Sequence, residues 1–513
     1  MNGADALIET LVANEVTACF ANPGTSEMQF VAALDRAPAM RPVLCLFEGV
    51  ATGAADGYGR MAGKPACTLL HLGPGYGNGL ANLHNARRAF TPVVNVVGDH
   101  ATYHRQYDAP LNSDIPTIVG PNSLWVKSAD SPDTVSALAA EAVTASYGPP
   151  GGPVSLILPA DSAWLETRNG VVKADVPVRA AAAGTTIEAV AKRVREAAKP
   201  VILLGAQATS AEGLAQAARL AAAGVRVLAD TFIARQPRGA GVFQPGRMQY
   251  FGEAALADLA GTDLMVFVGT VTPVAFFAYP GRPSVLVPEG CETTTLTTRS
   301  EDSVAGLAAL ADALGAPASG PAQPFKVADG APTGPLTPQA CGLSVARHLP
   351  EGAIICDDSV TSGGGVAVPC STARPHDVLA LTGGAIGIGG PLAIGAAVAA
   401  PGRKVLSLNG DGSAMYTVQS LWTMAREQLD VTVVVFANHS YRILNIEMGR
   451  TGSGDPGPSA SKLLDLGDPK IDWVSVAKGM GVPAVRCETA EEFDAAFARA
   501  MAEPGPKFIE AAI

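Results

Sequence analysis

Short apolar runs alternate with Ala-rich segments of helical periodicity along the whole chain, and the alternation falls into three blocks. Each run lies between turn-forming residues, as strands do when both faces of a parallel sheet are buried. The pattern predicts an α/β fold of three doubly wound domains with mainly parallel sheets. We expect strands at TACFA, PVLCLF, ACTLLHL, PVVNVVGD and PVSLILPA in the first block, at PVILLGA, VRVLADT, LMVFVGT and SVLVPEG in the second, and at AIICDD, VLALTGG, KVLSLNGDG, VTVVVFANHS and KFIEAAI in the third.

Two stretches without periodicity separate the blocks. Val178–Thr186 is rich in Ala and Gly, and Ala316–Pro335 is rich in Pro, Gly and Ala, as linkers are. A chain of 513 residues also exceeds what one hydrophobic core organises. We therefore expect an N-terminal domain at residues 1–170, a central domain at 185–318 and a C-terminal domain at 336–513.

Composition narrows the classes of partner. The net charge is -11 and no basic stripe occurs, which excludes a nucleic-acid partner or an anionic membrane surface. The apolar stretch Val378–Ala400 is interrupted by glycines and Pro391, so it predicts a buried strand, turn and helix and not a membrane span. The N-terminus lacks the basic start of a signal peptide, and the eight scattered cysteines predict free thiols. A cytoplasmic location is expected.

The segment Gly410-Asp411-Gly412-Ser413 joins an apolar strand to an amphipathic helix, expected at MYTVQSLWTMAREQ. Ligands bind where strands of open α/β sheets end, and glycines there let backbone N–H groups approach phosphate oxygens. An acidic side chain at an anion-binding site indicates that a cation lies between the carboxylate and the anion. Mg²⁺ prefers carboxylate and phosphate oxygens as ligands. The next strand ends at Asn438, whose amide oxygen is a further hard ligand. Taken alone, a Gly-Asp-Gly turn is more often a helix N-cap than a binding site.

GDGS followed by about 25 residues and Asn438 resembles the motif of thiamin-diphosphate-dependent enzymes. The resemblance covers the whole chain and is strongest to the acetolactate synthase and benzoylformate decarboxylase group. It implies thiamin diphosphate and Mg²⁺ as cofactors, with pyrimidine-binding, central and diphosphate-binding domains in that order. The resemblance assigns Asp411, Asn438 and the Ser440 carbonyl to Mg²⁺, and Gly410, Gly412, Ser413, the Ala414 amide and Tyr441 to the diphosphate.

The same resemblance assigns a second set of residues to the first block. Glu48 follows the strand PVLCLF and matches the glutamate that hydrogen-bonds the cofactor's aminopyrimidine ring in the family. Thr25, in the turn Asn22-Pro23-Gly24-Thr25-Ser26, matches a substrate-facing serine of benzoylformate decarboxylase, and His71 matches its first active-site histidine. Simpler explanations remain open: a carboxylate stabilising a helix N-terminus, a polar capping turn and a core histidine.

Two further segments are expected to meet the cofactor. The turn Gly384-Ala385-Ile386 aligns with the place where a bulky apolar residue supports the bent cofactor, and Ile386 is the candidate. Asp358, Ser359 and Thr361 follow the strand AIICDD and are candidates for the diphosphate, although a polar turn explains them as well.

The sequence also departs from its relatives. No histidine occurs at residues 274–279, where the decarboxylase has its second active-site histidine. The Arg-Phe-Asp-Asp run by which acetolactate synthases hold FAD is missing, so FAD is not expected. Ile443 and Glu447 occupy positions that line the substrate pocket in relatives, and Glu447 is an unusual charge for an aromatic-acid pocket.

These observations predict decarboxylation of a small-molecule 2-oxo acid, in which Glu48 activates the cofactor and His71 and Thr25 handle substrate protons. Acetolactate synthase-type carboligation stays open, as does a cofactor-binding subunit without catalysis. The resemblance implies a homodimer or homotetramer, because in the family the pyrimidine domain of one subunit faces the diphosphate domain of another.

Overall fold

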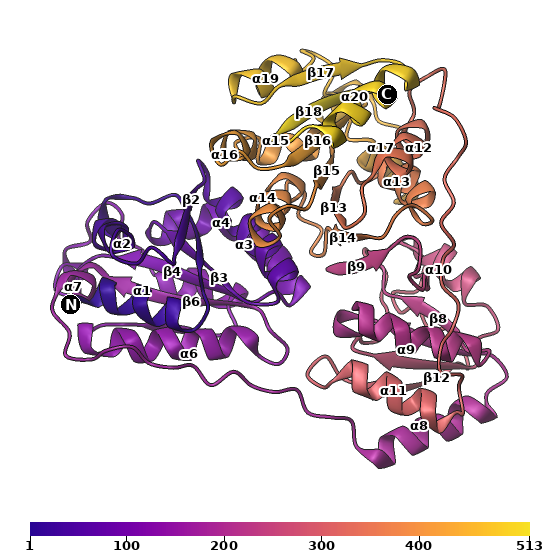
Figure 1. The fold of residues 1–513 in the computed structure, drawn as a ribbon, viewed down its shortest axis with the longest axis horizontal. Coiled ribbons are helices and arrows are strands. Elements are labelled where there is room, and N and C mark those ends of the chain that lie inside the picture. Colours follow the sequence, from indigo (N-terminus) through magenta and orange to yellow (C-terminus); the bar gives the residue numbers. More distant parts are fainter.

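Three mainly parallel sheets, each covered by helices, make up the structure, a computed structural model that describes residues 1–513 (Figure 1). This confirms the predicted α/β class. In Figure 1 the N-terminal sheet lies on the left, the C-terminal sheet at the upper right and the central sheet at the lower right. The central strands of each sheet are apolar, and their side chains are buried on both faces of the sheet.

The first sheet is six-stranded and entirely parallel. Its strands, in spatial order, are β2 (Arg41–Leu44), β1 (Ala18–Ala21), β3 (Ala66–Leu70), β4 (Val93–Asp99), β6 (Pro153–Pro159) and β5 (Val126–Ser128). Its helices are α1 (Gly3–Ala13), α2 (Met28–Leu34), α3 (Glu48–Ala62), α4 (Leu72–Ala89), α5 (Ile115–Val119), α6 (Val135–Tyr147) and α7 (Ala160–Trp164). Helices α1 and α6 pack together on one face, and α3 and α4 pack together on the other (Figure 1).

The second sheet is five-stranded and parallel. Its strands, in spatial order, are β10 (Gly246–Arg247), β8 (Arg226–Ala229), β7 (Pro200–Leu204), β11 (Leu264–Val268) and β12 (Glu292–Thr297). Its helices are α8 (Gly184–Glu196), α9 (Ala211–Ala222), α10 (Gly252–Asp258) and α11 (Ser303–Ala313). An extended segment from the first sheet reaches α8 along the lower edge of the molecule (Figure 1).

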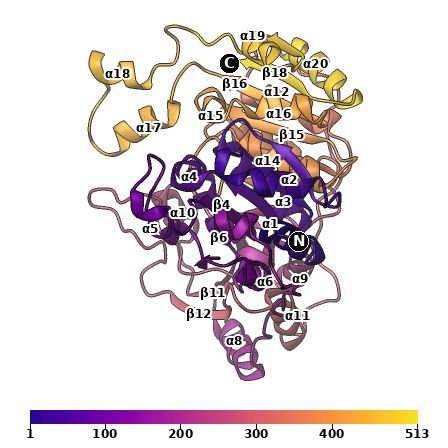
Figure 2. The same ribbon diagram turned by 90° about the vertical axis from the view of Figure 1, so that its left-hand side faces the viewer.

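The third sheet is seven-stranded, and its edge strand β9 comes from the central part of the chain and pairs antiparallel. Its strands, in spatial order, are β17 (Ala484–Cys487), β18 (Lys507–Ala512), β16 (Val431–Ala437), β15 (Val405–Gly410), β13 (Ala353–Asp358), β14 (His376–Ala380) and β9 (Arg235–Arg238). Its helices are α12 (Pro338–His348), α13 (Gly363–Cys370), α14 (Gly389–Ala399), α15 (Asp411–Tyr416), α16 (Ser420–Arg426), α17 (Arg442–Arg450), α18 (Pro458–Leu464), α19 (Trp473–Gly479) and α20 (Ala490–Ala502). Figure 2 shows α17 and α18 projecting from this part of the molecule.

The first and third sheets share a core through the pair of helices α3 and α14. A Cβ atom on Gly57 would lie 2.2 Å from the Leu392 carbonyl oxygen, and one on Gly395 would lie 1.9 Å from that of Ala54. Larger residues at these two glycines would force the helices apart. The small residues of α3 therefore set how closely the two sheets approach.

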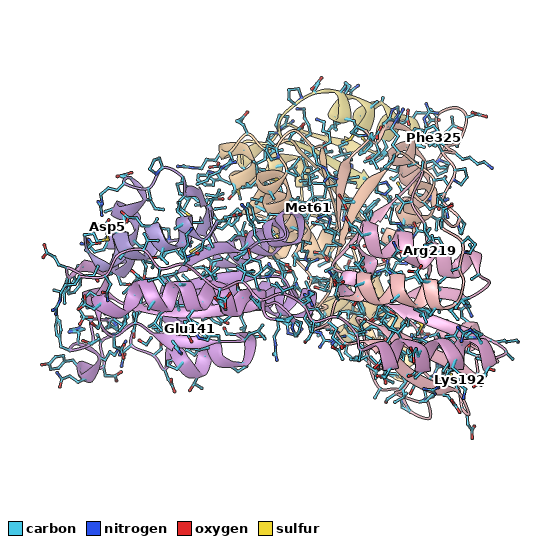
Figure 3. All side chains as sticks on the ribbon, turned by 60° about the horizontal axis from the view of Figure 1, so that its bottom comes forward. Asp5, Met61, Glu141, Lys192, Arg219 and Phe325 are labelled. Carbon is cyan, nitrogen blue, oxygen red and sulfur yellow. The ribbon has the colours of Figure 1, made fainter.

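A buried ion pair extends this junction to the central segment. The Arg60 guanidinium donates to both carboxylate oxygens of Asp56, at 2.8 and 2.6 Å, and to the carbonyls of Ala380 and Ala234. The Arg60 side chain on α3 thus bonds the last residue of β14 and the residue before β9. In Figure 3, Met61 lies at this junction, whereas Glu141 and Lys192 lie on outward-facing helices.

Two predicted elements are wrong. The segment SVLVPEG, residues 284–290, forms no strand, because Leu286 instead packs into the core beside β11 and donates its N–H to the Pro273 carbonyl. The neighbouring run Glu292–Thr297, rich in β-branched threonine, supplies the strand. The helix expected at MYTVQSLWTMAREQ is two helices, α15 and α16, because Thr417 leaves the helical conformation and donates its hydroxyl to the Gly387 carbonyl.

The predicted strand, turn and helix at Val378–Ala400 is confirmed by β14 and α14. No helix is both long enough and apolar enough to cross a membrane. All eight cysteines are free thiols, as predicted, and seven of them are buried.

Candidate functional site

Glu48 begins α3, directly after the segment that follows β2. The residue is only 7% exposed, and its Oε2 atom accepts a hydrogen bond from the Asn78 amide at 3.0 Å. A Cβ atom on Gly75 would lie 3.4 Å from Glu48 Oε1 and 3.2 Å from His71 Cβ. Glu48 and His71 therefore flank the same glycine at the start of α4, so the structure brings these two sequence-predicted residues together.

His71 follows β3 and is the N-cap of α4. Its Nδ1 atom lies 2.9 Å from Oε2 of Glu27, a buried carboxylate that the sequence did not single out. The turn that contains Thr25 continues as a short 3₁₀ helix over Thr25–Glu27. Thr25 itself is exposed, and Ser26, the next residue, is the one that contacts Glu27.

Asp411 directly follows the strand β15 and begins α15, as the apolar strand followed by Gly-Asp-Gly predicted. Its Oδ1 accepts from the Gly412 N–H at 2.9 Å and its Oδ2 from the His439 N–H at 2.6 Å. Burial raises the pKa of the Asp411 carboxyl, and no Lys or Arg side chain pairs with it. A buried carboxylate without a cationic partner at a helix start suits a divalent ion.

The end of β16 supplies the remaining oxygens beside Asp411. Asn438 Oδ1 accepts from the Ser440 N–H at 2.9 Å, and the Ser440 carbonyl accepts no hydrogen bond. The bond from the His439 N–H to Asp411 ties this turn to β15. One carboxylate, one amide oxygen and one carbonyl oxygen thus gather at the ends of two neighbouring strands. No group of three or more His, Cys, Asp or Glu side chains suited to a metal occurs in the chain.

Tyr441 covers the glycine turn, as expected for a residue that lies over a bound group. A Cβ atom on Gly412 would lie 2.3 Å from the Tyr441 ring, so only glycine fits beneath it. Ser413 is buried next to this turn, and Ala414 is partly buried on the first turn of α15. The first turn of α15 beyond Gly412 has backbone N–H groups without a helical partner, and such groups can bind phosphate oxygens.

The turn between β14 and α14 lies against the central part of the chain. Gly384 has a φ of +80°, and a Cβ atom there would lie 2.7 Å from the Phe276 ring. Ile386, two residues on, is partly buried, whereas Thr361 is exposed and makes no side-chain hydrogen bond. The ring of Phe276 therefore approaches the turn where the sequence predicted the support of a bent cofactor.

The Asp358 carboxylate bonds to the backbone of the turn between β14 and α14. Its Oδ2 accepts from the N–H groups of Gly387, Ile388 and Gly389 at 2.8, 3.0 and 3.3 Å, so it caps the start of α14. The Oδ1 atom is buried without a partner, and burial raises the pKa of Asp358 to about 7. Asp358 therefore caps α14 in the structure, and its contact with the diphosphate stays a prediction.

This pKa predicts a pH-dependent stability. The folded value of about 7 exceeds the ordinary value of 3.8, so the folded chain holds the proton more tightly. The contribution of Asp358 is full below pH 4 and is lost as the pH rises through 7. Relative to wild type, Asp358→Asn should therefore gain about 2–4 kcal/mol of stability between pH 5 and pH 8. Thermal unfolding of both proteins across this range tests it, and a constant difference in melting temperature would contradict it.

Glu447, on α17, is engaged by the central segment. Tyr279 donates its hydroxyl to Glu447 Oε2 at 2.7 Å, and the Arg450 guanidinium lies 4.9 Å from the Tyr279 ring and 4.0 Å from the Phe251 ring. Ile443, one turn earlier on α17, is partly buried. Phe232, Tyr250, Phe276 and Phe277 form an aromatic cluster beside this contact. The segment without the expected histidine is therefore aromatic and anchored by Glu447.

The two sets of candidate residues make no direct polar contact with each other within one chain. No hydrogen bond or ion pair joins Glu48, His71 or Thr25 to Asp411, Asn438 or Ser440. Exposed apolar side chains lie near both sets: Met28 and Leu46 near the first, and Met415, Tyr416, Leu444 and Ile446 near the second.

Two family models match the chain in the segments that carry these residues. The model described as thiamine pyrophosphate enzyme, N-terminal TPP binding domain, matches residues 1–117, and its C-terminal TPP binding domain counterpart matches residues 366–511. A Mycobacterium tuberculosis protein that is provisionally named an acetolactate synthase large subunit is 52% identical over 522 residues, covering 100% of this chain and 99% of that protein. The chain belongs to the thiamine pyrophosphate enzyme family.

Other members of the thiamine pyrophosphate enzyme family point the same way. A benzoylformate decarboxylase of Pseudomonas aeruginosa is 28% identical, with 98% of this chain and 97% of that protein covered. The solved structure of a thiamine diphosphate-dependent 4-hydroxybenzoylformate decarboxylase from Rhodococcus jostii RHA1 superposes with a TM-score of 0.88 at 26% identity, covering 100% of this chain and 99% of that one. Both the decarboxylase and the acetolactate synthase branches of the family are thus represented among similar proteins.

Proposed function

We propose that the chain is a thiamin-diphosphate- and Mg²⁺-dependent enzyme that decarboxylates a 2-oxo acid without oxidation. Two buried carboxylates in different parts of the fold carry the proposal: Glu48 at the start of α3 and Asp411 at the start of α15. In this assignment residues 1–170 hold the aminopyrimidine, residues 336–513 hold the diphosphate, and residues 185–318 form the central domain.

The residues at the end of β15 fit the metal and the diphosphate. Asp411, Asn438 and the Ser440 carbonyl would bind Mg²⁺, because each has an oxygen with lone pairs left after its hydrogen bonds within the chain. The Gly412 and Ser413 turn would receive the phosphate oxygens at the α15 N-terminus, with Tyr441 above it. Ile386 would support the cofactor from the turn after β14, and Thr361 is a further candidate at this edge.

Glu48 and His71 are the protein's own proton-handling groups. Glu48, held by Asn78, would hydrogen-bond the aminopyrimidine ring, and its low exposure keeps water from competing. Bound thiamin diphosphate supplies the electron sink for the charge left when CO₂ departs. His71 would hold a proton beside the substrate, with the Thr25 hydroxyl at the entrance.

The aromatic cluster around Phe276 favours a substrate with an apolar substituent. Phe276 lies against Gly384, and the Glu447 charge is directed to Tyr279 and Arg450. The Glu447 carboxylate is compatible with an aromatic-acid pocket because Tyr279 donates a hydrogen bond to it and Arg450 lies beside it. We therefore propose that the substituent of the 2-oxo acid packs against this cluster, near Ile443.

Product analysis tests the proposed reaction. The enzyme is incubated with Mg²⁺, thiamin diphosphate and either benzoylformate or pyruvate, and CO₂, aldehyde and acetolactate are measured. We expect equal amounts of CO₂ and aldehyde, with benzoylformate the faster substrate. Acetolactate as the main product would favour the carboligase, and bound cofactor without turnover would favour the non-catalytic subunit.

We also propose that the active site forms between two subunits of a homodimer or homotetramer. The lack of polar contacts between the two residue sets within one chain and the exposed apolar side chains near both support this assembly. Each subunit would contribute Glu48 to one site and Asp411 to another.

Mixing two inactive variants tests this assembly. In a heterodimer of Glu48→Gln and Asp411→Ala subunits, one site carries both changes and the other carries neither. Random mixing should therefore restore about a quarter of wild-type activity. The control mixes each variant with itself, and activity no higher than these controls would contradict a site shared between subunits.

A further inference from the structure

Glu27 is a buried carboxylate beneath His71 to which the proposed reaction gives no role. Its side chain is 2% exposed, and both of its oxygens accept hydrogen bonds. Oε2 accepts from the Gly24 N–H at 2.7 Å and lies 2.9 Å from His71 Nδ1, and Oε1 accepts from the Ser26 hydroxyl at 2.6 Å. Three polar groups thus converge on one carboxylate that is removed from water.

The hydrogen-bond directions around Glu27 determine which nitrogen of His71 carries the proton. A carboxylate only accepts, and the Gly24 N–H only donates. The Ser26 hydroxyl directs its single proton to Glu27, so it has none left to give to His71. The Nδ1 atom of His71 must therefore donate. In a neutral imidazole this leaves Nε2 with a free lone pair.

Two glycines, one in the turn before Glu27 and one on β4, leave room for this pair. A Cβ atom on Gly24 would lie 2.1 Å from His71 Nδ1, and one on Gly98 would lie 1.9 Å from Glu27 Oε1. The imidazole ring thus lies directly against Gly24, and the carboxylate fills the space that Gly98 leaves on β4. A side chain at either position would displace the imidazole or the carboxylate, so the two glycines allow the pair to pack in this arrangement.

The other end of the imidazole remains available. His71 Nε2 has no hydrogen-bond partner in the chain. This atom is not buried, and the His71 side chain is 21% exposed. His71 also shares Gly75 with Glu48. His71 and the carboxylate proposed to activate the cofactor therefore lie beside the same residue at the start of α4.

We propose that Glu27 is a positioning residue that holds His71 in the Nδ1–H tautomer and presents the Nε2 lone pair to the substrate. The inference rests on the proposed function, in which His71 contacts the 2-oxo acid. Glu27 acts only through His71, since its own oxygens are buried and occupied. A carboxylate behind an imidazole sets its tautomer and orientation in the same way in other enzymes.

Nitrogen NMR of the holoenzyme labelled with ¹⁵N-histidine tests the tautomer without reference to activity. His71 is assigned as the signal that disappears in His71→Ala. Wild type should show the Nδ1–H form, and Glu27→Ala, which removes both acceptors, should shift His71 towards the Nε2–H form. Ser26→Ala is the matched control, because it removes a donor to the same carboxylate and should leave the tautomer unchanged. An Nε2–H form in wild type would overturn the proposal.

Kinetics separate positioning from a purely structural role. Glu27→Ala should lower kcat by about 10- to 100-fold with little change in KM, and should add nothing in a His71→Ala background. Glu27→Gln, which keeps one acceptor oxygen, should recover part of the loss and serves if Glu27→Ala does not fold. Equal losses in both backgrounds would overturn the proposal. If His71→Ala alone left turnover unchanged, the proposed function of His71 would fail, while the NMR result would still decide the tautomer.

Discussion

Glu48→Gln should lower turnover by about 10²- to 10⁴-fold while thiamin diphosphate still binds. Glutamine keeps the shape of the side chain and can accept the hydrogen bond from Asn78, so α3 and its packing on α14 are preserved. It cannot, however, exchange a proton with the aminopyrimidine ring. The loss should therefore appear in kcat and not in the affinity for the cofactor.

Steady-state kinetics and calorimetric titration with thiamin diphosphate measure the two quantities separately. Asn78→Ala is the matched control, because it removes the donor to Glu48 but leaves the carboxylate in place. Its effect on kcat should be smaller than that of Glu48→Gln. Unchanged turnover in Glu48→Gln would overturn the role assigned to this residue.

Asp411→Ala should abolish the Mg²⁺-dependent part of cofactor binding, with an apparent affinity lower by at least about 100-fold. Asp411 is the only carboxylate at the proposed metal site, and its bonds to the Gly412 and His439 N–H groups hold the ends of β15 and β16 together. Removing it takes away both a ligand and this connection.

A titration of cofactor binding against Mg²⁺ concentration distinguishes these effects from general damage. Asp465→Asn is the control, because Asp465 is an exposed carboxylate that accepts one backbone N–H in the neighbouring segment. It should bind the cofactor as wild type does. Full cofactor occupancy in Asp411→Ala would rule out the metal assignment.

The sheets could be predicted because their strands are apolar on both faces and lie between strong turn signals. The strand β16, Val431–Ala437, is a continuous β-branched and apolar run with Asn438 directly after it. The strand β9 could not be predicted, because Arg235–Arg238 is polar and gains its place only by pairing with β14. The local pattern of apolar and polar residues carries no information on the pairing of β9 with β14, which is far away in the sequence.

Site residues that directly follow a strand could be predicted from the sequence. Site residues that depend on contacts between distant segments could not be predicted. Residues that follow directly after strand-forming runs could be identified from their position, as Glu48, His71 and Asp411 were. Glu27 could not, since its importance lies in the approach of His71 from a separate strand and in the absence of a side chain at Gly98. A carboxylate two residues after a turn otherwise indicates only a helix start.

The loop around Tyr279 was also beyond prediction. The missing histidine at residues 274–279 left this segment without an assigned role, yet Tyr279 bonds Glu447 and thereby connects the central segment to α17. That contact joins residues 168 positions apart in the sequence. It also gives the Glu447 carboxylate, an unusual charge for an aromatic-acid pocket, a partner within the chain.

The most direct test of the account is the dependence of CO₂ release on the cofactor. Protein freed of thiamin diphosphate and Mg²⁺ is titrated with both in the presence of saturating 2-oxo acid, and CO₂ is measured continuously. We expect no release when either component is missing, and a rate that rises to a maximum at one thiamin diphosphate per chain. Stoichiometric cofactor binding without CO₂ release from any 2-oxo acid of a broad panel would contradict it.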